Sequence, residues 1–424
     1  MNNFTGFGKI LLGASLAAIS SSLFAGGLYI SEFGAPSMGA SGAGAGVLAE
    51  DASTAFHNPA GIMLLEPKKN HWMVSVVYVD PSVKFSKDSG TDVTPLAAGA
   101  GNGGDAGDSA IAGGFWWARP INDKFGAGFA LTSISAAVLD YSDDFVGRYW
   151  AKQVELLTIN LMPSFAYRIN DKWSVAFAVP VMFGSLDMDI AIPRAIGIGP
   201  PTPATDGQAL IKDGDDVSAT VSVSALWEAT DTLRFGLAYK GENELKFNGD
   251  LRLTLPVGVT APEVNVDVTI PFVQTIRLWN STDIGPKATL LASIAWEDWS
   301  SFDNVLISTD GPSGALKRDW DDTWKFALGL RWRTGGPWTH YTGIAYDTSP
   351  NNAATRTTDM PIDDQLRLSA GTTYTLQSGV SIGGALTYAD YGDAEINNGS
   401  PKWGTVSGEY STNRIIFFGV NVGW

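Results

Sequence analysis

Apolar residues alternate with small or charged residues, at a period of two, along most of this 424-residue chain. In residues 324–333 the even positions hold Trp, Phe, Leu, Leu and Trp, and the odd positions hold Lys, Ala, Gly, Arg and Arg. Residues 416–424 repeat the pattern, with Ile, Phe, Val, Val and Trp at the even positions. Successive side chains of a strand point to opposite faces, so each such segment predicts a β-strand with one apolar face. The chain is therefore predicted to be all-β.

The connectors between the predicted strands alternate between short and long. We count about fourteen strands, near residues 71–86, 109–118, 124–138, 153–168, 173–190, 215–228, 232–248, 264–281, 287–298, 323–334, 338–347, 364–376, 379–390 and 411–424. The short connectors are 119–123, 169–172, 229–231, 282–286, 335–337 and 377–378, and the long ones lie near 87–108, 139–152, 191–214, 249–263, 299–322, 348–363 and 391–410. Short periplasmic turns, long external loops and an even strand number are typical of outer-membrane barrels.

The shortage of charge supports a transmembrane antiparallel β-barrel over a soluble β-sandwich. A sandwich would expose polar strand faces to water all around it. Charged residues make up only 17% of this chain, below the ~25% of soluble domains. A barrel with an apolar outer wall and a polar interior explains the difference.

The first 25 residues read as a secretory signal peptide. Lys9 precedes an apolar run over residues 10–19, and a stretch of small residues ends at Ala25. No later run of about 18 apolar residues follows, so no transmembrane helix is expected and a membrane-embedded form must be a barrel. We expect a signal peptide at 1–25, an N-terminal hatch at 26–66 and a barrel at 67–424.

Composition also excludes several classes of function. The chain has no cysteine, and its three histidines show no metal-ligand spacing, so we expect no metal site and no cofactor. A formal net charge of −16 argues against nucleic-acid binding, which requires a basic surface. No nucleophile motif accompanies the histidines, so an outer-membrane lipase is disfavoured and we expect no enzyme.

Residues 26–66 do not alternate and are rich in Gly, Ala and Ser. A disordered leader is usually charge-rich and poor in aromatics, whereas this segment holds Tyr29, Phe33 and Phe56. Small residues allow backbone to approach backbone closely. The segment is therefore predicted to be a hatch that plugs the lumen of the barrel, which a general porin would lack.

A set of motifs in the same order resembles the FadL/TodX family of outer-membrane transporters for long-chain fatty acids and aromatic hydrocarbons. In the hatch these are Ser-Glu-Phe (31–33), Ala-Glu-Asp-Ala (49–52) and Asn-Pro-Ala-Gly (58–61). In the barrel they are residues 147–149, 160–168, 170–174, 299–302, 326–329, 343–350 and 369–372. The resemblance spans the mature chain and implies a fourteen-stranded barrel with a hatch, in the outer membrane of a Gram-negative bacterium.

The resemblance also implies a transport route. External loops, here 191–214 and 249–263, would collect the ligand and pass it to a lumenal pocket that the mature N-terminus reaches. A kinked third strand would then release it sideways into the membrane. The expected cargo is a long-chain fatty acid, and aromatic or alkane hydrocarbons are the alternative. Outer-membrane lipids are further expected partners, and we expect a monomer.

Residue roles follow from the same resemblance. Asn58, Pro59 and Ala60 match the hatch motif that touches the third strand near its kink, although a simple turn would also use Asn and Pro. Gly26, Gly27 and Leu28 match the mobile mature N-terminus. The kink is expected at Ser133, Ile134, Ser135 and Ala136.

Cations are expected near the ligand carboxylate. A basic residue implied just before the tenth strand is replaced here by Asp321 and Asp322. The candidates that could substitute for it are Arg194, Lys325, Arg331 and Arg333. The alternative is that these four side chains form lumenal salt bridges.

The chain ends on a predicted strand whose last residue is Trp424. A terminal aromatic residue on a closing strand is expected to be recognised by the barrel assembly machinery. An anchor at the membrane interface is the alternative role, and the two are compatible.

Overall fold

The computed structural model describes residues 33–91, 100–193, 202–256, 258, 260–302, 304–309, 313–400 and 404–424. Strands dominate this part of the chain. The helical segments are α2 (Gly34–Met38), α3 (Thr54–His57), η1 (Pro59–Leu64) and η3 (Trp299–Ser301). None of the helices in the described ranges has the length and apolar character that a membrane crossing requires.

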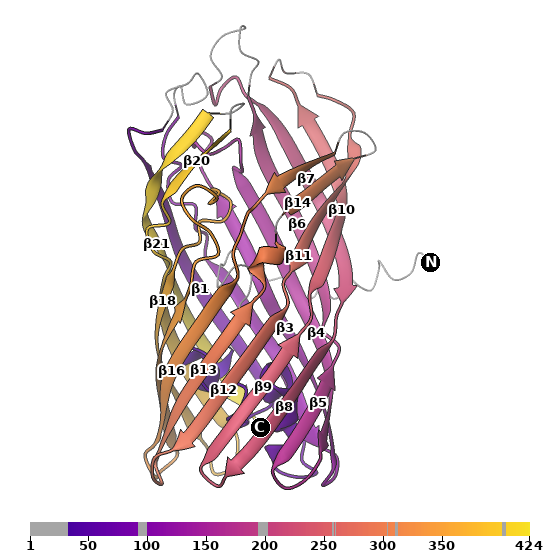
Figure 1. Cartoon of the computed structure of the whole chain (residues 1–424), viewed down its shortest axis with the longest axis vertical. Helices are drawn as coiled ribbons and strands as arrows, with labels where there is room; N and C mark the ends of the chain where they lie inside the picture. Colours follow the sequence, from indigo (N-terminus) through magenta and orange to yellow (C-terminus); the bar gives the residue numbers. More distant parts are fainter. Residues whose placement is uncertain are drawn as a thin grey trace.

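The strands form one closed antiparallel barrel (Figure 1). They are β1 (His71–Lys87), β2 (Ala110–Pro120), β3 (Phe125–Asp140), β4 (Gln153–Arg168), β5 (Trp173–Ala178), β6 (Val181–Ile192), β7 (Gly207–Ala219), β8 (Ser222–Thr230), β9 (Leu233–Lys240), β10 (Asn243–Thr254), β11 (Val264–Phe272), β12 (Thr275–Asp283), β13 (Ala288–Glu297), β14 (Asn304–Thr309), β15 (Ser313–Lys317), β16 (Thr323–Arg333), β17 (Trp338–Asp347), β18 (Gln365–Thr375), β19 (Ser381–Asp390), β20 (Ile396–Ser400) and β21 (Gly404–Gly423). Fourteen wall strands are present, as predicted.

Pairing of the first strand with the last closes the barrel. β1 pairs with β21 over most of its length, for example Val77 with Gly419. The seam continues to the last residue, because the Trp72 amide donates to the Trp424 carbonyl at 2.9 Å and the Trp424 amide donates back to Trp72 at 3.0 Å. Trp424 thus takes part in closure through its backbone, and its role in recognition by the assembly machinery stays a prediction.

Four of the wall strands that were expected to be continuous are interrupted once. The strands expected at 173–190, 215–228, 232–248 and 264–281 are β5–β6, β7–β8, β9–β10 and β11–β12. Pro180 lies at the first break, and proline has no N–H to donate to a ladder. Single bonds bridge the breaks, including one from the Thr220 amide to the Pro180 carbonyl at 3.0 Å. Each pair of strands therefore acts as one wall strand.

Parts of the expected external loops are also strand. β7 begins at Gly207 and β10 reaches Thr254, so the loops expected at 191–214 and 249–263 are shorter than predicted. The hairpin β14–β15 extends the sheet from β11, with Val268 paired to Ile307, inside the loop expected at 299–322. β20 likewise pairs with β21. Strands therefore continue the barrel wall into the region where external loops were expected, at the end opposite the short turns (Figure 1).

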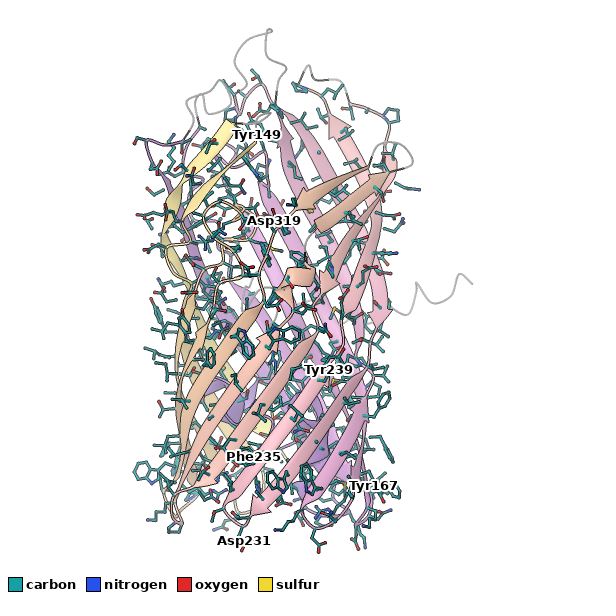
Figure 2. The ribbon with its side chains drawn as sticks, in the orientation of Figure 1. Tyr149, Tyr167, Asp231, Phe235, Tyr239 and Asp319 are labelled. Carbon is teal, nitrogen blue, oxygen red and sulfur yellow. The ribbon has the colours of Figure 1, made fainter. Side chains whose placement is uncertain are left out.

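Outward side chains are apolar and inward ones are small or polar. Leu328, which faces outward, is 63% exposed, while Ala327 beside it is buried. Outward aromatic residues gather near the short turns, where Trp173 stacks on Trp227 at a centroid distance of 5.3 Å. Figure 2 places Asp231 and Tyr167 at this end and Tyr149 at the other. This distribution is that of a barrel with a lipid-facing wall and an aromatic girdle.

The described part of the hatch lies inside the barrel, against glycines of the wall. A Cβ added at Gly371 would lie 2.9 Å from Cα of Gly39, and one added at Gly343 would collide with the Ala40 carbonyl. Hydrogen bonds fix the same segment, since the Ala35 amide donates to Oδ1 of Asn421 at 2.9 Å. The glycines therefore let the backbone of the hatch rest directly on the strands.

Candidate functional site in the lumen

A cavity lies between the hatch and the barrel wall. Its volume is about 60 Å³, and its lining comes from α3, β3, β4, β8, β9 and β12. A second, smaller cavity shares His57, Arg277 and Trp279 with the first. Figure 2 places Tyr239, the neighbour of the lining residue Lys240, in the half of the barrel nearer the short turns. The two cavities form a candidate binding site, which we call the lumenal site.

One wall of the lumenal site is cationic. Lys240 at the end of β9 and Arg277 on β12 line the first cavity, and Arg277 and Lys325 on β16 line the second. Thr275 pairs with Lys240 in the sheet, two residues from Arg277, so these two cations are neighbours. The Arg277 guanidinium is 2.9 Å from the carboxylate of Glu297, which is buried. We call Lys240, Arg277 and Lys325 the cation wall.

The facing wall is largely apolar. Ile134 of β3 and Met162 of β4 contribute side chains that are almost completely buried. The hatch contributes Phe56 and His57 of α3 to the lining, and their rings lie 5.2 Å apart in an edge-to-face arrangement. The site therefore offers positive charge on one side and hydrocarbon-like surface on the other.

Of the four predicted cations, the structure places only Lys325 in the lumenal site. Arg331 is buried and bonds to Glu50 of the hatch, with Asp283 at 3.4 Å. Arg333 also pairs with Glu50, at 3.2 Å. These two arginines anchor the hatch to β16. Arg194 lies outside the described residues.

Lys240 and Arg277 were missed by the prediction from sequence. Both stand on the small or charged face of an alternating segment, opposite the lipid-facing Leu237 and Ile276. The signal that could have identified them is a charged residue on the lumen-facing side of a strand in the middle of the chain. Asp321 and Asp322, at the position that the resemblance implied to be basic, are not among the residues that line the two cavities. Asp322 instead accepts a hydrogen bond from Nε1 of Trp296 at 3.0 Å.

Asn58 is fully buried and joins three segments. Its amide donates to the carbonyls of Gly46 in the hatch, at 2.8 Å, and Ala225 of β8, at 3.0 Å. Its Oδ1 accepts from the Ala60 amide and caps η1, with Pro59 at the first helical position. The side-chain hydrogen bonds of Asn58 thus go to the hatch and to β8, while η1, which begins at Pro59, also contacts β3. Contact of this motif with the kink of the third strand stays a prediction.

The third strand is irregular where the kink was expected. Ser133 pairs with Ile159 and Ser135 pairs with Thr158, so Ile134 is an extra residue of the bulge. The backbone of Ala136 continues the ladder with Leu157 of β4. A bulge bends a strand and disrupts pairing on it. Gly26, Gly27 and Leu28, expected to form the mobile N-terminus, lie outside the described residues.

On its other side the third strand loses its partner at the bulge. The β2–β3 ladder ends at the pair Gly114–Thr132. Across the described residues, the next bridge upward joins Gly107 to Leu139. The backbone between these two bridges is unpaired in the β2–β3 direction, and we call this stretch the ladder gap. Ile134, which lines the lumenal site, lies beside it.

Buried ion pairs order the external loops. Arg318 makes a two-bond pair with Asp359, including 2.6 Å from Nη2 to Oδ2, and both side chains are buried. Arg148 pairs with Asp206 at 2.8 Å, and both are buried. Burial raises the pKa of the Asp359 carboxyl, but the charge and hydrogen bonds of Arg318 outweigh it, so the pKa of Asp359 lies below its usual value.

Sequence comparison identifies the family. The sequence model described as "Outer membrane protein transport protein (OMPP1/FadL/TodX)" matches residues 16–423. The chain belongs to this family. Its members are outer-membrane transport channels of Gram-negative bacteria for fatty acids or hydrocarbons, and not enzymes.

Individual relatives agree with this assignment. A long-chain fatty acid transport protein of Escherichia coli O6:H1 is 27% identical over 417 residues, which cover 92% of each chain. The crystal structure of a Pseudomonas aeruginosa FadL homologue matches with a TM-score of 0.84 at 23% identity, covering 94% of this chain and 99% of that one. The Pseudomonas putida toluene transporter TodX matches with a TM-score of 0.69 at 13% identity, covering 92% and 98%. The two solved structures share the fold of this family member.

Proposed function

We propose that this family member takes up long-chain fatty acids across the outer membrane and releases them sideways into it. The observation that carries the choice of cargo is the lumenal site, where the cation wall faces apolar side chains. A fatty acid has one anionic group and a long apolar chain, so it matches both walls at once. The similarity to a relative that is a long-chain fatty acid transport protein supports the same cargo.

The physical argument concerns the cost of burying charge. A carboxylate leaves water for a closed lumen only where opposite charge and hydrogen bonds replace its hydration. Lys240, Arg277 and Lys325 place three basic side chains along the lining of the site, and Arg277 is paired with Glu297. A hydrocarbon would gain nothing from these cations, whereas the acyl chain gains from contact with Ile134 and Met162.

Paired cargoes test this proposal. Uptake of a fatty acid and of an alkane of the same chain length is measured in cells that express Lys240→Met, with Lys240→Arg as the charge-preserving partner. Loss of one charge-assisted hydrogen bond is worth about 1.5–3 kcal/mol, or more than tenfold. Fatty-acid uptake is expected to fall by about that factor in Lys240→Met, and to recover in Lys240→Arg, while alkane uptake is unchanged.

A matched control is Lys69→Met, which removes an exposed lysine that pairs with Glu66 outside the lumen. It is expected to leave both cargoes unaffected. A wild-type protein that carries alkanes or monoaromatic compounds but no fatty acid would support the hydrocarbon alternative. Equal losses for both cargoes in Lys240→Met would mean that the cation wall only maintains the lumen.

Lateral release is supported by the ladder gap. A stretch of unpaired strand backbone weakens a barrel wall locally, because the hydrogen bonds of the ladders hold the strands of the wall together. The bulge at Ile134 bends β3 at this place, and the side chain of Ile134 reaches the lumenal site. Cargo in the site is thus one side chain away from the interrupted part of the wall.

Crosslinking tests the route. The chain has no native cysteine, so cysteines at Ile111 of β2 and Ser133 of β3, on the two strands that border the ladder gap, can be bridged by a reducible thiol crosslinker. Bridging is expected to stop fatty-acid uptake, and reduction to restore it. The control pair Phe115 and Leu131 lies inside the formed ladder, and bridging it should have no effect. Uptake that survives a complete Ile111–Ser133 bridge excludes this exit.

A further inference from the structure

Four polar side chains lie in the barrel wall at the lower end of the ladder gap. Ser75 of β1, Thr132 of β3 and Asn160 of β4 share one register across the sheet, through Gly114 of β2. Thr158 is the next inward residue of β4 and pairs with Ser135 beyond the bulge. Each of the four side chains is at most 3% exposed. We call Ser75, Thr132, Thr158 and Asn160 the polar row.

The polar row is incomplete as a hydrogen-bonded unit. Among the described residues, the hydroxyl oxygens of Ser75, Thr132 and Thr158 and Oδ1 of Asn160 have no partner within hydrogen-bonding distance. A buried polar group without a partner costs free energy, and native proteins nearly always provide one. Nε1 of Trp116, whose ring lies against Gly114 in this patch, is a further buried atom without a partner among the described residues. Such a group of atoms within one patch of the wall indicates that something polar completes it during function.

Three of the four residues of the polar row lie near both the lumenal site and the ladder gap. A Cβ at Gly114 would collide with the ring of Trp116, so this indole covers the position between Ser75 and Thr132. Asn160, two strands along the sheet from Gly114, lines the lumenal site together with Lys240 and Arg277. Thr132 is the last residue of β3 that pairs with β2 below the ladder gap. Thr132, Thr158 and Asn160 therefore lie between the cation wall and the proposed exit.

The three side chains accommodate a head group that both donates and accepts hydrogen bonds. The two hydroxyls can donate or accept, whereas an amide oxygen only accepts. A carboxylate has no hydrogen to give to Oδ1 of Asn160, but a protonated carboxyl group has one, and its carbonyl oxygen can accept from the threonines. The cation wall favours the ionised carboxylate. A neutral head group, in contrast, enters a hydrocarbon environment at much lower cost.

We infer that Thr132, Thr158 and Asn160 form a second head-group site, which holds the protonated carboxyl group of the cargo before it passes the ladder gap. The inference rests on the proposed fatty-acid cargo and adds an intermediate station to its path. The carboxylate leaves the cation wall, takes up a proton from solvent in the lumen, and hydrogen-bonds to the three side chains. The acyl chain points toward Ile134 meanwhile.

The test uses three cargoes of equal chain length: a fatty acid, its methyl ester and the alkane. Their uptake is measured in lipid vesicles that contain purified wild-type protein, Thr132→Val with Thr158→Val, or Asn160→Leu. Each lost hydrogen bond is worth about three- to tenfold. Fatty-acid uptake is expected to slow by this factor in Asn160→Leu, and by about its square in the double threonine variant, which loses two hydroxyls. The ester, which has no O–H to donate, is expected to respond to the threonine changes and not to Asn160→Leu, and the alkane to neither.

Two controls keep the result interpretable. Ser164→Ala removes another buried hydroxyl of β4 that faces the lumen and that, among the described residues, also has no partner, but it lies four residues nearer the short turns. It is expected to leave all three cargoes unaffected. Thr132→Ser with Thr158→Ser restores the hydroxyls and should restore uptake. Folding of each variant is checked by the heat-dependent mobility of the barrel on a denaturing gel.

Results that contradict the second head-group site can be told apart from results that contradict the fatty-acid proposal. Equal slowing of the three cargoes, or no slowing at all, would overturn the second head-group site, since the polar row would then hold only water. In both cases fatty-acid uptake by the wild type, and its dependence on Lys240, would still stand. If the wild type carries only the alkane, the fatty-acid proposal itself fails, and the second site fails with it.

Discussion

Glu50 of the hatch and Arg331 of β16 form an ion pair inside the barrel, and the arginine is buried. The second carboxylate oxygen of Glu50 accepts from the hydroxyl of Tyr341 at 2.8 Å. Arg333 adds a further contact at 3.2 Å. One side chain of the hatch is therefore held by three side chains from two neighbouring strands, β16 and β17.

We expect Glu50→Ala to loosen the hatch. Breaking a buried ion pair by removing one partner costs about 3–5 kcal/mol, because the other charge stays buried without compensation; Arg331 keeps Asp283 and Thr289, so the lower end applies. The measurement is ion conductance of single channels in planar bilayers, which should rise above the wild-type value. Glu66→Ala, which removes an exposed ion pair with Lys69, should leave conductance unchanged. An unchanged conductance in both variants would show that Glu50 does not hold the hatch.

The glycines beneath the hatch give a second prediction. We expect Gly343→Val to displace the hatch, since even a Cβ at this position collides with the backbone of Ala40. Protease cleavage within the hatch should become faster, and the channel should leak ions. Gly384→Val is the matched control: in this glycine of β19 an added Cβ has its nearest neighbour at 3.8 Å. A folded, well-sealed Gly343→Val protein would contradict close packing of hatch and wall.

The external ion pair predicts a dependence on pH. The pKa of Asp359 in the folded protein lies below its unfolded value, which is about 3.9. Its contribution to stability is therefore complete above that unfolded value and is lost as pH falls through the folded pKa. Proteolysis of the loop between β17 and β18, with an acid-active protease, should accelerate at pH values below about 4.

Two variants check this assignment. Asp359→Asn should show fast cleavage at every pH, because the ion pair with Arg318 is absent throughout. Asp319→Asn removes an exposed partner of Lys317 and should keep the wild-type profile. An acid-induced acceleration that persists in Asp359→Asn would mean that another carboxyl group controls the loop.

The wall of this barrel could be predicted because lipid imposes a strict alternation. Every wall strand must place its apolar side chains toward the lipid, as β16 does from Trp324 to Trp332. The alternation in the sequence shows, residue by residue, which side chains face outward. The breaks near Pro180 could not be predicted in the same way, because alternation continues through them: Phe177 and Phe183 share the outward face on either side. Strand count therefore follows from sequence, whereas local interruptions depend on single backbone bonds.

The lumenal site was harder to predict because it is built across many strands. Lys240 and Arg277 are far apart in sequence and become neighbours only through the pairing of β9 with β12. Arg331 looked equally suitable in sequence, yet it faces Glu50 of the hatch. Arg331 differs from Lys240 and Arg277 because the hatch covers it. The sequence of the hatch does not alternate, so it does not predict which inward side chains of the wall the hatch contacts.

The position of the hatch has a consequence for biogenesis. Its first part, α2, contacts β18, β19 and β21, while α3 and η1 contact β2, β3 and β4. The hatch thus spans the seam at which β1 meets β21, and it is synthesised before either edge of that seam has a partner. In the folded barrel, the strands made last and those made first contact this same segment. Folding around this internal template would make an empty, open cylinder an improbable intermediate, and would link the sealing of the pore to the completion of the chain.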